Sequence, residues 1–266
     1  MKVFLSIDIE GVNGICHWEE TDASSPRYKE FQEELQREVN AACRGAIRAG
    51  ATEIVIKDAH DSARNLNILD LPEMVKLHRG WEGGPCSMMA GLDSTFDAVV
   101  FVGYHSPSRS NGNPLSHTMN TNIHHLKINN VIASEFTINS YYASLLNVPV
   151  AFLSGDANLT KLVKEINPNI ETVASKEGRF NAVISKHPHL TWREIEEGVF
   201  NALTKKDLSQ NIVSLPKKFD VEVQYKRHTD AYRNSFFPGC KLLGSDRVTY
   251  QASNYNDVLT ALKFIL

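Results

Sequence analysis

Carboxylate and imidazole side chains follow three apolar segments of the chain, and this pattern is the one best suited to chemistry. The first segment leads into Asp8 and Glu10, a later one into Asp58-Ala59-His60, and a third into Gly103-Tyr104-His105. Alternate side chains of a strand share a face, so Asp8 and Glu10 should project together. Two carboxylates on one face repel unless a cation neutralises them or one keeps its proton. Carboxylate oxygen and imidazole nitrogen together suit zinc or a similar divalent ion, so the pattern predicts a metal site.

The elements that must position these side chains alternate between strand and helix. Strands are predicted over residues 3–9, 53–57 and 97–102, and an amphipathic helix over residues 29–49. Repeated strand, helix, strand order implies parallel pairing with helices on both faces of the sheet. Ligands of such sheets bind at the carboxyl ends of the strands. We therefore expect an α/β fold, a three-layer α/β/α sheet with the metal site at the strand carboxyl ends, plus a smaller α+β part.

The second half of the chain has a different pattern. Asn129-Asn130 between β-forming residues predicts a tight hairpin, and Ser134-Glu135 should open a helix that runs to about Leu146. A buried strand is expected over residues 148–154. Later elements are expected as a helix over residues 159–166 and a strand over residues 171–175, and the segments 192–204, 221–226, 248–252 and 255–266 complete an α+β second part. We place an α/β metal-site domain at residues 1–150 and an α+β C-terminal part at residues 151–266, with one continuous domain as the alternative.

Composition excludes several classes of partner. The formal charge of −3 provides no basic patch for nucleic acid, and no uncharged apolar stretch is long enough to span a membrane. The start of the chain lacks the pattern of a secretory signal. The cysteines lie far apart without CxxC pairing, which argues against a disulfide framework or a thiolate zinc site; they are Cys16, Cys43, Cys86 and Cys240. A cytoplasmic protein is the simplest interpretation.

Each candidate ligand also has an ordinary structural explanation. A single Asp at the end of a strand most often caps a helix or forms a turn, and most of the histidines lie in polar, loop-like contexts. His60 and His105 differ because apolar segments should deliver both to the same edge of the sheet. The hypothesis of a metal site therefore depends on the whole constellation and not on any one residue.

Five separated segments carry a resemblance to a known family. They read SIDIEGVNGI, KDAHDSARNL, MMAGLDSTFDAVVFVGYHS, LSHTMN and ASEFTINSYYASLLNVPVAFLSGD. In order and spacing they resemble the D-aminopeptidase family of zinc-dependent, self-compartmentalising bacterial peptidases. The match is strong to about Asp156 and looser afterwards.

The resemblance implies a particular site. It implies two zinc ions per chain, held by Asp8, Glu10, His60, His105 and Glu135, and a catalytic role for His117. Asp8 would bridge the ions, with Glu10 and Glu135 completing one coordination sphere and the two histidine ligands the other. Paired divalent ions of this kind polarise a carbonyl and activate a water. His117 would then act as proton donor or base, although the family histidine could also be a nucleophile.

The function implied is hydrolysis of the N-terminal residue of short peptides or amides, with D-residues preferred. The family also implies a homo-oligomer, arranged as a ring-shaped decamer. Two other classes stay open. One is a different di-metal hydrolase, such as a phosphoesterase or amidase, although the chain has no phosphate-binding GxxxxGK[ST] or GxGxxG segment. The other is a non-catalytic metal-binding oligomer.

Overall fold

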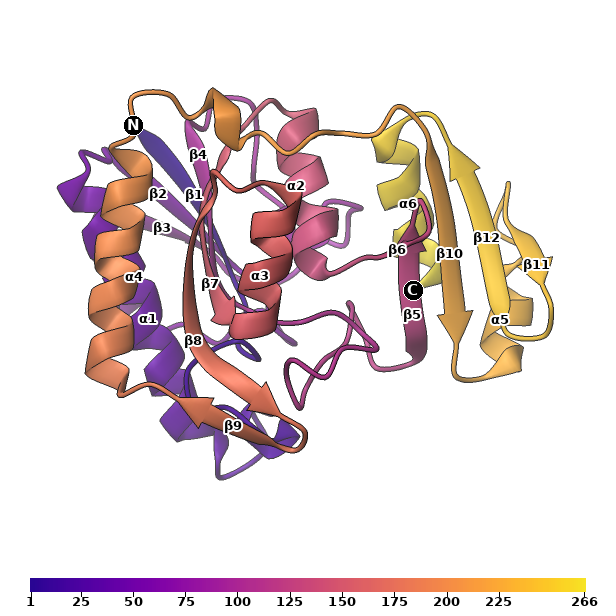
Figure 1. Ribbon diagram of the computed structural model, residues 1–266, viewed down its shortest axis with the longest axis horizontal. Helices are drawn as coiled ribbons and strands as arrows, with labels where there is room; N and C mark the ends of the chain where they lie inside the picture. Colours follow the sequence, from indigo (N-terminus) through magenta and orange to yellow (C-terminus); the bar gives the residue numbers. More distant parts are fainter.

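The computed structural model describes all 266 residues and contains two β-sheets (Figure 1). The larger sheet has the strand order β3-β2-β1-β4-β7-β8-β9. Its strands are β1 (Lys2–Ile7), β2 (Glu53–Asp58), β3 (Val75–His78), β4 (Ala98–Tyr104), β7 (Val150–Asp156), β8 (Glu171–Arg179) and β9 (Ala182–Ser185). All neighbours are parallel except β8 and β9, which are antiparallel. The expected parallel α/β sheet is confirmed, and β3 is a strand that the sequence analysis missed.

Helices cover both faces of the larger sheet and complete three layers (Figure 1). On one face, α1 (Tyr28–Arg48) and α4 (Pro188–Leu203) pack together over a core that includes Val3, Leu5 and Ile7 of β1. On the other face, α2 (Glu135–Leu145) and α3 (Ala157–Ile166) share a core with alternate strand residues such as Phe4. Strands buried on both faces read as continuous apolar segments, which explains why β1 and β4 were recognisable in the sequence.

The smaller sheet is antiparallel and has the strand order β11-β12-β10-β5-β6. Its strands are β5 (Ile123–Ile128), β6 (Val131–Ile132), β10 (Phe219–Tyr225), β11 (Lys241–Leu243) and β12 (Arg247–Ala252). The hairpin between β5 and β6 turns at Asn129 and Asn130, whose φ angles of 52° and 64° are those of a tight turn, as predicted. Helices α5 (His228–Asn234) and α6 (Tyr255–Ile265) pack against this sheet.

The two sheets do not divide the chain at residue 150, where the sequence analysis placed a domain boundary. β5 and β6 precede that residue but belong to the smaller sheet, whereas β7, β8 and β9 follow it and belong to the larger one. Chain order and sheet membership differ here because the chain leaves the larger sheet after β4 and returns to it with β7. As a boundary between separately folding domains, residue 150 stays a prediction. None of the helices is both long and apolar enough to cross a lipid bilayer.

The strand register explains how distant site residues meet. Ile7, the last residue of β1, pairs with Asp58 of β2 on one side and with Val102 of β4 on the other. Asp8 therefore emerges between the ends of two parallel neighbours, with His60 following β2 and His105 following β4. Because β1 ends at Ile7, Asp8 and Glu10 lie in the loop after the strand, and strict strand alternation does not set their directions.

Backbone segments approach one another unusually closely beside these strand ends. A Cβ atom added at Gly155 would lie 2.0 Å from the carbonyl oxygen of Tyr104, and one at Gly11 would lie 1.8 Å from the same oxygen. Gly103 has a φ of +72°, and its added Cβ would lie 2.2 Å from the carbonyl oxygen of Asp8. Only glycine permits this approach, so these glycines allow the ends of β1, β4 and β7 to come together.

The first prediction concerns this packing. Gly155→Ala should lower the free energy of unfolding by about 1–3 kcal/mol, because the obstructing atom belongs to the backbone of β4 and must move. Gly84→Ala is the matched control, since an added Cβ there meets nothing within 4 Å. Its stability should be unchanged or slightly raised. Urea denaturation measures both variants, and equal stabilities would contradict the close-packing argument.

Candidate metal centre

The predicted ligands lie together at the carboxyl edge of the larger sheet. Asp8 follows β1 directly, His60 lies two residues after β2, His105 follows β4 directly, and Glu135 is the first residue of α2. Ser134 caps that helix, as its position in the sequence indicated. All five predicted ligands, including Glu10, are buried. The topology therefore gathers residues that are up to 127 positions apart, counted from Asp8 to Glu135.

The two oxygens of Asp8 face two different histidines. Asp8 Oδ1 lies 3.4 Å from His60 Nδ1, and Asp8 Oδ2 lies 3.5 Å from His105 Nε2. Glu10 Oε2 lies 3.1 Å from the same nitrogen of His60, and Glu135 Oε2 lies 3.5 Å from the same nitrogen of His105. Asp8 thus stands between two groups of side chains, each with one histidine and one glutamate.

This grouping differs from the expected coordination spheres, which stay a prediction. The sequence analysis placed Glu10 with Glu135 and His60 with His105. In the structure Glu10 lies next to His60, and Glu135 lies next to His105, while ligand atoms of Asp8, Glu10 and His105 also lie close enough together to hold one ion. The reason lies in the strand order, because β2 and β4 flank β1 on opposite sides.

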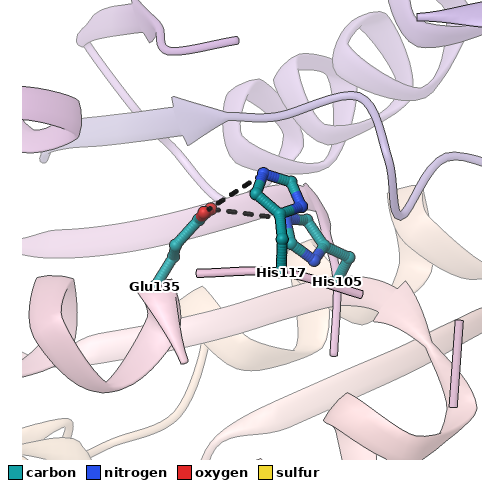
Figure 2. Close-up of side chains that lie close together, drawn as sticks. All are labelled: His105, His117 and Glu135. Carbon is teal, nitrogen blue, oxygen red and sulfur yellow. Dashed lines mark ion pairs between the residues drawn. The ribbon is translucent and has the colours of Figure 1, made fainter. Parts of the chain in front are cut away.

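His117 lies beside the second group, in the loop between β4 and β5. Its Nε2 is 3.8 Å from Glu135 Oε1, and its ring stacks on that of His105 with 4.4 Å between centroids (Figure 2). The ring of Trp18 packs edge-on against the His117 ring, with 5.3 Å between the two centroids. Its Nδ1 pairs with the carbonyl of Leu115 at 2.9 Å. Nitrogen and oxygen atoms of His105, His117 and Glu135 lie close enough together to hold one ion, so the geometry also permits His117 as a ligand.

Backbone carbonyls orient the two histidines predicted as ligands. His60 Nε2 lies 2.9 Å from the carbonyl oxygen of Thr21, and His105 Nδ1 lies 2.9 Å from that of Ser106. A ring N–H that donates to a carbonyl leaves the other nitrogen with a lone pair. In both histidines that other nitrogen faces the carboxylates. Lone pairs directed toward carboxylates in this way are what a cation requires.

Two buried atoms test whether a metal fits. Glu10 Oε2 and His105 Nε2 are buried and form no hydrogen bond. A buried polar atom without a partner is costly, and such atoms are rare in folded proteins. Both atoms point into the carboxylate–histidine cluster, where a divalent cation would satisfy them. The residues therefore fit a metal.

Without a metal, protons on the side chains partly neutralise the buried carboxylates. Burial raises the pKa of Asp8 well above its usual range, and the charge of Glu10 raises it further. Burial opposes charge on His105, but Glu135 and Asp8 outweigh it and raise its pKa to about 10. Burial likewise opposes charge on Glu135, yet His105 holds the pKa of Glu135 at about 2. A proton on His105 thus competes with a metal for the same site.

A second layer of contacts, which the sequence analysis missed, fixes the loop that carries Glu10. Lys176 of β8 is buried and donates from Nζ to the carbonyl oxygens of Glu10 and Ile15, both at 2.6 Å. Asn113 Nδ2 donates to the same Glu10 carbonyl at 2.9 Å and also lies 3.3 Å from Asp156 Oδ2. The only part of these contacts visible in the sequence was Asp156, which follows Gly155 at the end of a strand. That aspartate did not point to the site, because its position is equally well explained by its role as the N-cap of α3.

A cavity of about 840 Å³ opens onto the cluster. Its walls include the half-exposed rings of Trp18 and Trp81 and carboxylates outside the cluster. The volume suits a small organic ligand. The fold and the site together define an α/β protein with a carboxylate–histidine metal centre beneath a cavity, an arrangement common in metallohydrolases.

Comparison with known proteins identifies the family. The family model for D-aminopeptidases matches residues 1–264, and the chain belongs to this family. A D-aminopeptidase of Bacillus subtilis is 28% identical over 264 residues, which cover 98% of this chain and 95% of that protein. The solved structure of the Zn-dependent D-aminopeptidase DppA from Bacillus subtilis, a self-compartmentalizing protease, matches with a TM-score of 0.93 at 28% identity. It covers 100% of this chain and 96% of that one.

The second prediction concerns the metal-free protein. Glu135 has a pKa of about 2 against an ordinary 4.5, so its stabilising contribution is present above pH 4.5 and lost as the pH falls toward 2. His105 has a pKa of about 10 against an ordinary 6.5, so its contribution is complete below pH 6.5 and lost as the pH rises toward 10. The ion pair between Glu135 and His105 should therefore stabilise the chelator-treated protein most between pH 4.5 and 6.5.

Urea denaturation of the wild type and of His105→Gln measures this contribution. The wild type should lose its advantage in unfolding free energy as the pH rises above 6.5, because only the wild type carries the imidazole of His105. A difference between the two proteins that stayed constant from pH 5 to pH 9 would contradict the assigned ion pair.

Proposed function

We propose that this member of the D-aminopeptidase family is a zinc-dependent aminopeptidase that removes the N-terminal residue of short peptides or amides, with D-residues preferred. The observation that carries the proposal is the position of Asp8, whose two oxygens face two separate histidine–glutamate groups. The Zn-dependence described for the Bacillus subtilis structure supports zinc as the metal. The expected cytoplasmic location belongs to the same proposal, and cell fractionation tests it.

We assign the five predicted ligands to two metal positions. Asp8 bridges the positions, Glu10 and His60 complete one, and His105 and Glu135 complete the other. Two zinc ions per chain follow. When bound, zinc supplies Lewis-acid polarisation of the peptide carbonyl and makes water a better nucleophile near neutral pH.

His117 is the residue that we propose to move the proton. Its Nδ1 is engaged by the carbonyl of Leu115, which leaves Nε2 directed toward Glu135 at the floor of the cavity. The rings of Trp18 and His105 restrict its orientation. An imidazole held in this way can accept a proton from water and deliver it to the leaving amine. We favour this role over that of a nucleophile because water can supply the attacking oxygen.

The charge of the cavity supports action at a free amino terminus. Carboxylates outside the metal centre line its walls, namely Glu19, Asp22, Asp61 and Glu82. A cationic α-amino group is attracted to such a wall, whereas a phosphate ester is repelled. This argues for a peptide over the phosphoester that the sequence alone left open.

The third prediction tests metal positions and catalytic role together. Purified protein should contain close to two zinc ions per chain. Asp8→Ala should lower that content and abolish hydrolysis of D-aminoacyl amides, because it removes the shared ligand. His117→Ala should keep the metal content but slow turnover by about 10²–10⁴-fold, as expected for loss of a general acid or base.

Elemental analysis and steady-state kinetics on the same preparations give both values. His124→Ala is the matched control, because His124 is exposed and lies outside the centre. Full metal content in Asp8→Ala would refute the bridge. Loss of zinc from His117→Ala would make His117 a ligand, and full activity would remove its catalytic role.

The fourth prediction concerns assembly. We propose a homo-oligomer, and from the family resemblance a ring-shaped decamer, because the related Bacillus subtilis structure is described as a self-compartmentalizing protease. Large exposed aromatic side chains support an interface, notably Tyr232, Phe236 and Phe264. Sedimentation equilibrium at micromolar concentration should give a large oligomer. A fully active monomer would contradict the proposal.

A further inference from the structure

Lys263 stands out among the residues that line the cavity above the metal centre. It is the only lysine or arginine there, although Glu19, Asp22, Asp61 and Glu82 line the same cavity. Its ammonium group forms neither a hydrogen bond nor a salt bridge within the chain. The cavity therefore contains one cation without a partner and several carboxylates.

The position of Lys263 separates it from the metal ligands. It lies in the last turn of α6, which packs against the smaller sheet, whereas the metal ligands come from the edge of the larger sheet and from α2. In Figure 1, α6 lies on the side of the smaller sheet that is turned toward the larger one. A ligand in the cavity would thus touch the metal centre at one end and Lys263 at another wall.

A smaller recess of about 190 Å³ adjoins this wall. Pro85, Ser87, Met119 and Lys263 line both the recess and the main cavity. The rest of the recess is largely apolar and is formed by Asn120, Ile138, Leu259, Leu262 and Leu266. Lys263, which is exposed, therefore lies where a charged cavity meets a largely apolar recess.

We propose that Lys263 and this recess bind the C-terminal residue of a short peptide substrate. The ammonium group pairs with the substrate α-carboxylate, and the recess receives the adjacent side chain. This inference rests on the proposed function. A short peptide at neutral pH carries a cation at one end and an anion at the other, and the cavity presents carboxylates and one ammonium group to match them. Lys263 is then a specificity-determining residue.

The consequence is a preference for substrates with a free C-terminus close to the cleaved bond. A peptide amide lacks the anion, and a long chain carries its carboxylate beyond the reach of Lys263. A charge-assisted pair of this kind changes affinity by about 10- to 100-fold. The preference should therefore appear as a ratio of kcat/KM values between a dipeptide and its amide.

Steady-state kinetics of the zinc-loaded protein test the proposal with D-alanyl-D-alanine and its C-terminal amide. The wild type should favour the free acid. Lys263→Met should lose about 10- to 100-fold in kcat/KM on the acid, mainly through KM, and should change little on the amide. Lys263→Arg should keep most of the preference. Lys161→Met is the matched control, because Lys161 is exposed on α3 outside the cavity.

Calorimetric titration of His117→Ala, with and without Lys263→Met, gives a second readout that does not depend on turnover. Affinity for the acid should fall in the double variant, while affinity for the amide should not. Equal losses on acid and amide would overturn the role of Lys263 and assign the residue to the stability of α6, and no loss on either would overturn that role outright. A wild type that hydrolyses neither peptide would instead overturn the proposed function.

Discussion

The burial of three carboxylates in one cluster is the constraint on which the site depends. Asp8, Glu10 and Glu135 are each at most 4% exposed, and their charges repel at short range. Imidazoles between them reduce this repulsion, yet Glu10 Oε2 and His105 Nε2 still form no hydrogen bond. Desolvation of a charge is costly unless it is paired or coordinated to a metal. A divalent cation would resolve both problems at once, which is the physical reason for proposing this cluster as the metal site.

The backbone must be rigid for such a cluster to persist. Glycines at the ends of β1, β4 and β7 permit close contact between strands, and Lys176 and Asn113 hold the carbonyl of Glu10. Carbonyls of Thr21 and Ser106 orient the two histidines. Contacts of this kind orient ligands and raise their basicity. They come from loops and strands far apart in sequence, so the fold as a whole determines the geometry of the centre.

The cavity joins the two sheets into one functional unit. The larger sheet supplies the metal centre, and α6 of the smaller sheet's layer supplies Lys263 on another wall. If Lys263 binds substrate as we propose, the smaller sheet's layer takes part in recognising substrate as well as in building a core. Because the chain leaves the larger sheet after β4, returns with β7 and leaves again after β9, the two parts are connected three times, and their relative placement is constrained by the topology.

The sequence by itself determined the parallel sheet, the tight turn at Asn129-Asn130 and the edge at which carboxylates and histidines gather. Buried parallel strands produce continuous apolar segments, and polar residues at the ends of these segments can be recognised from the sequence alone. Only the tertiary structure decided that Glu10 groups with His60 and Glu135 with His105, because that depends on β2 and β4 flanking β1. The contact of Lys176 with the Glu10 carbonyl and the place of Lys263 in the cavity wall also could not be predicted from the sequence. A lone lysine in a strand or in the last turn of a helix has no local signature, and its chemistry arises only from neighbours that the fold brings to it.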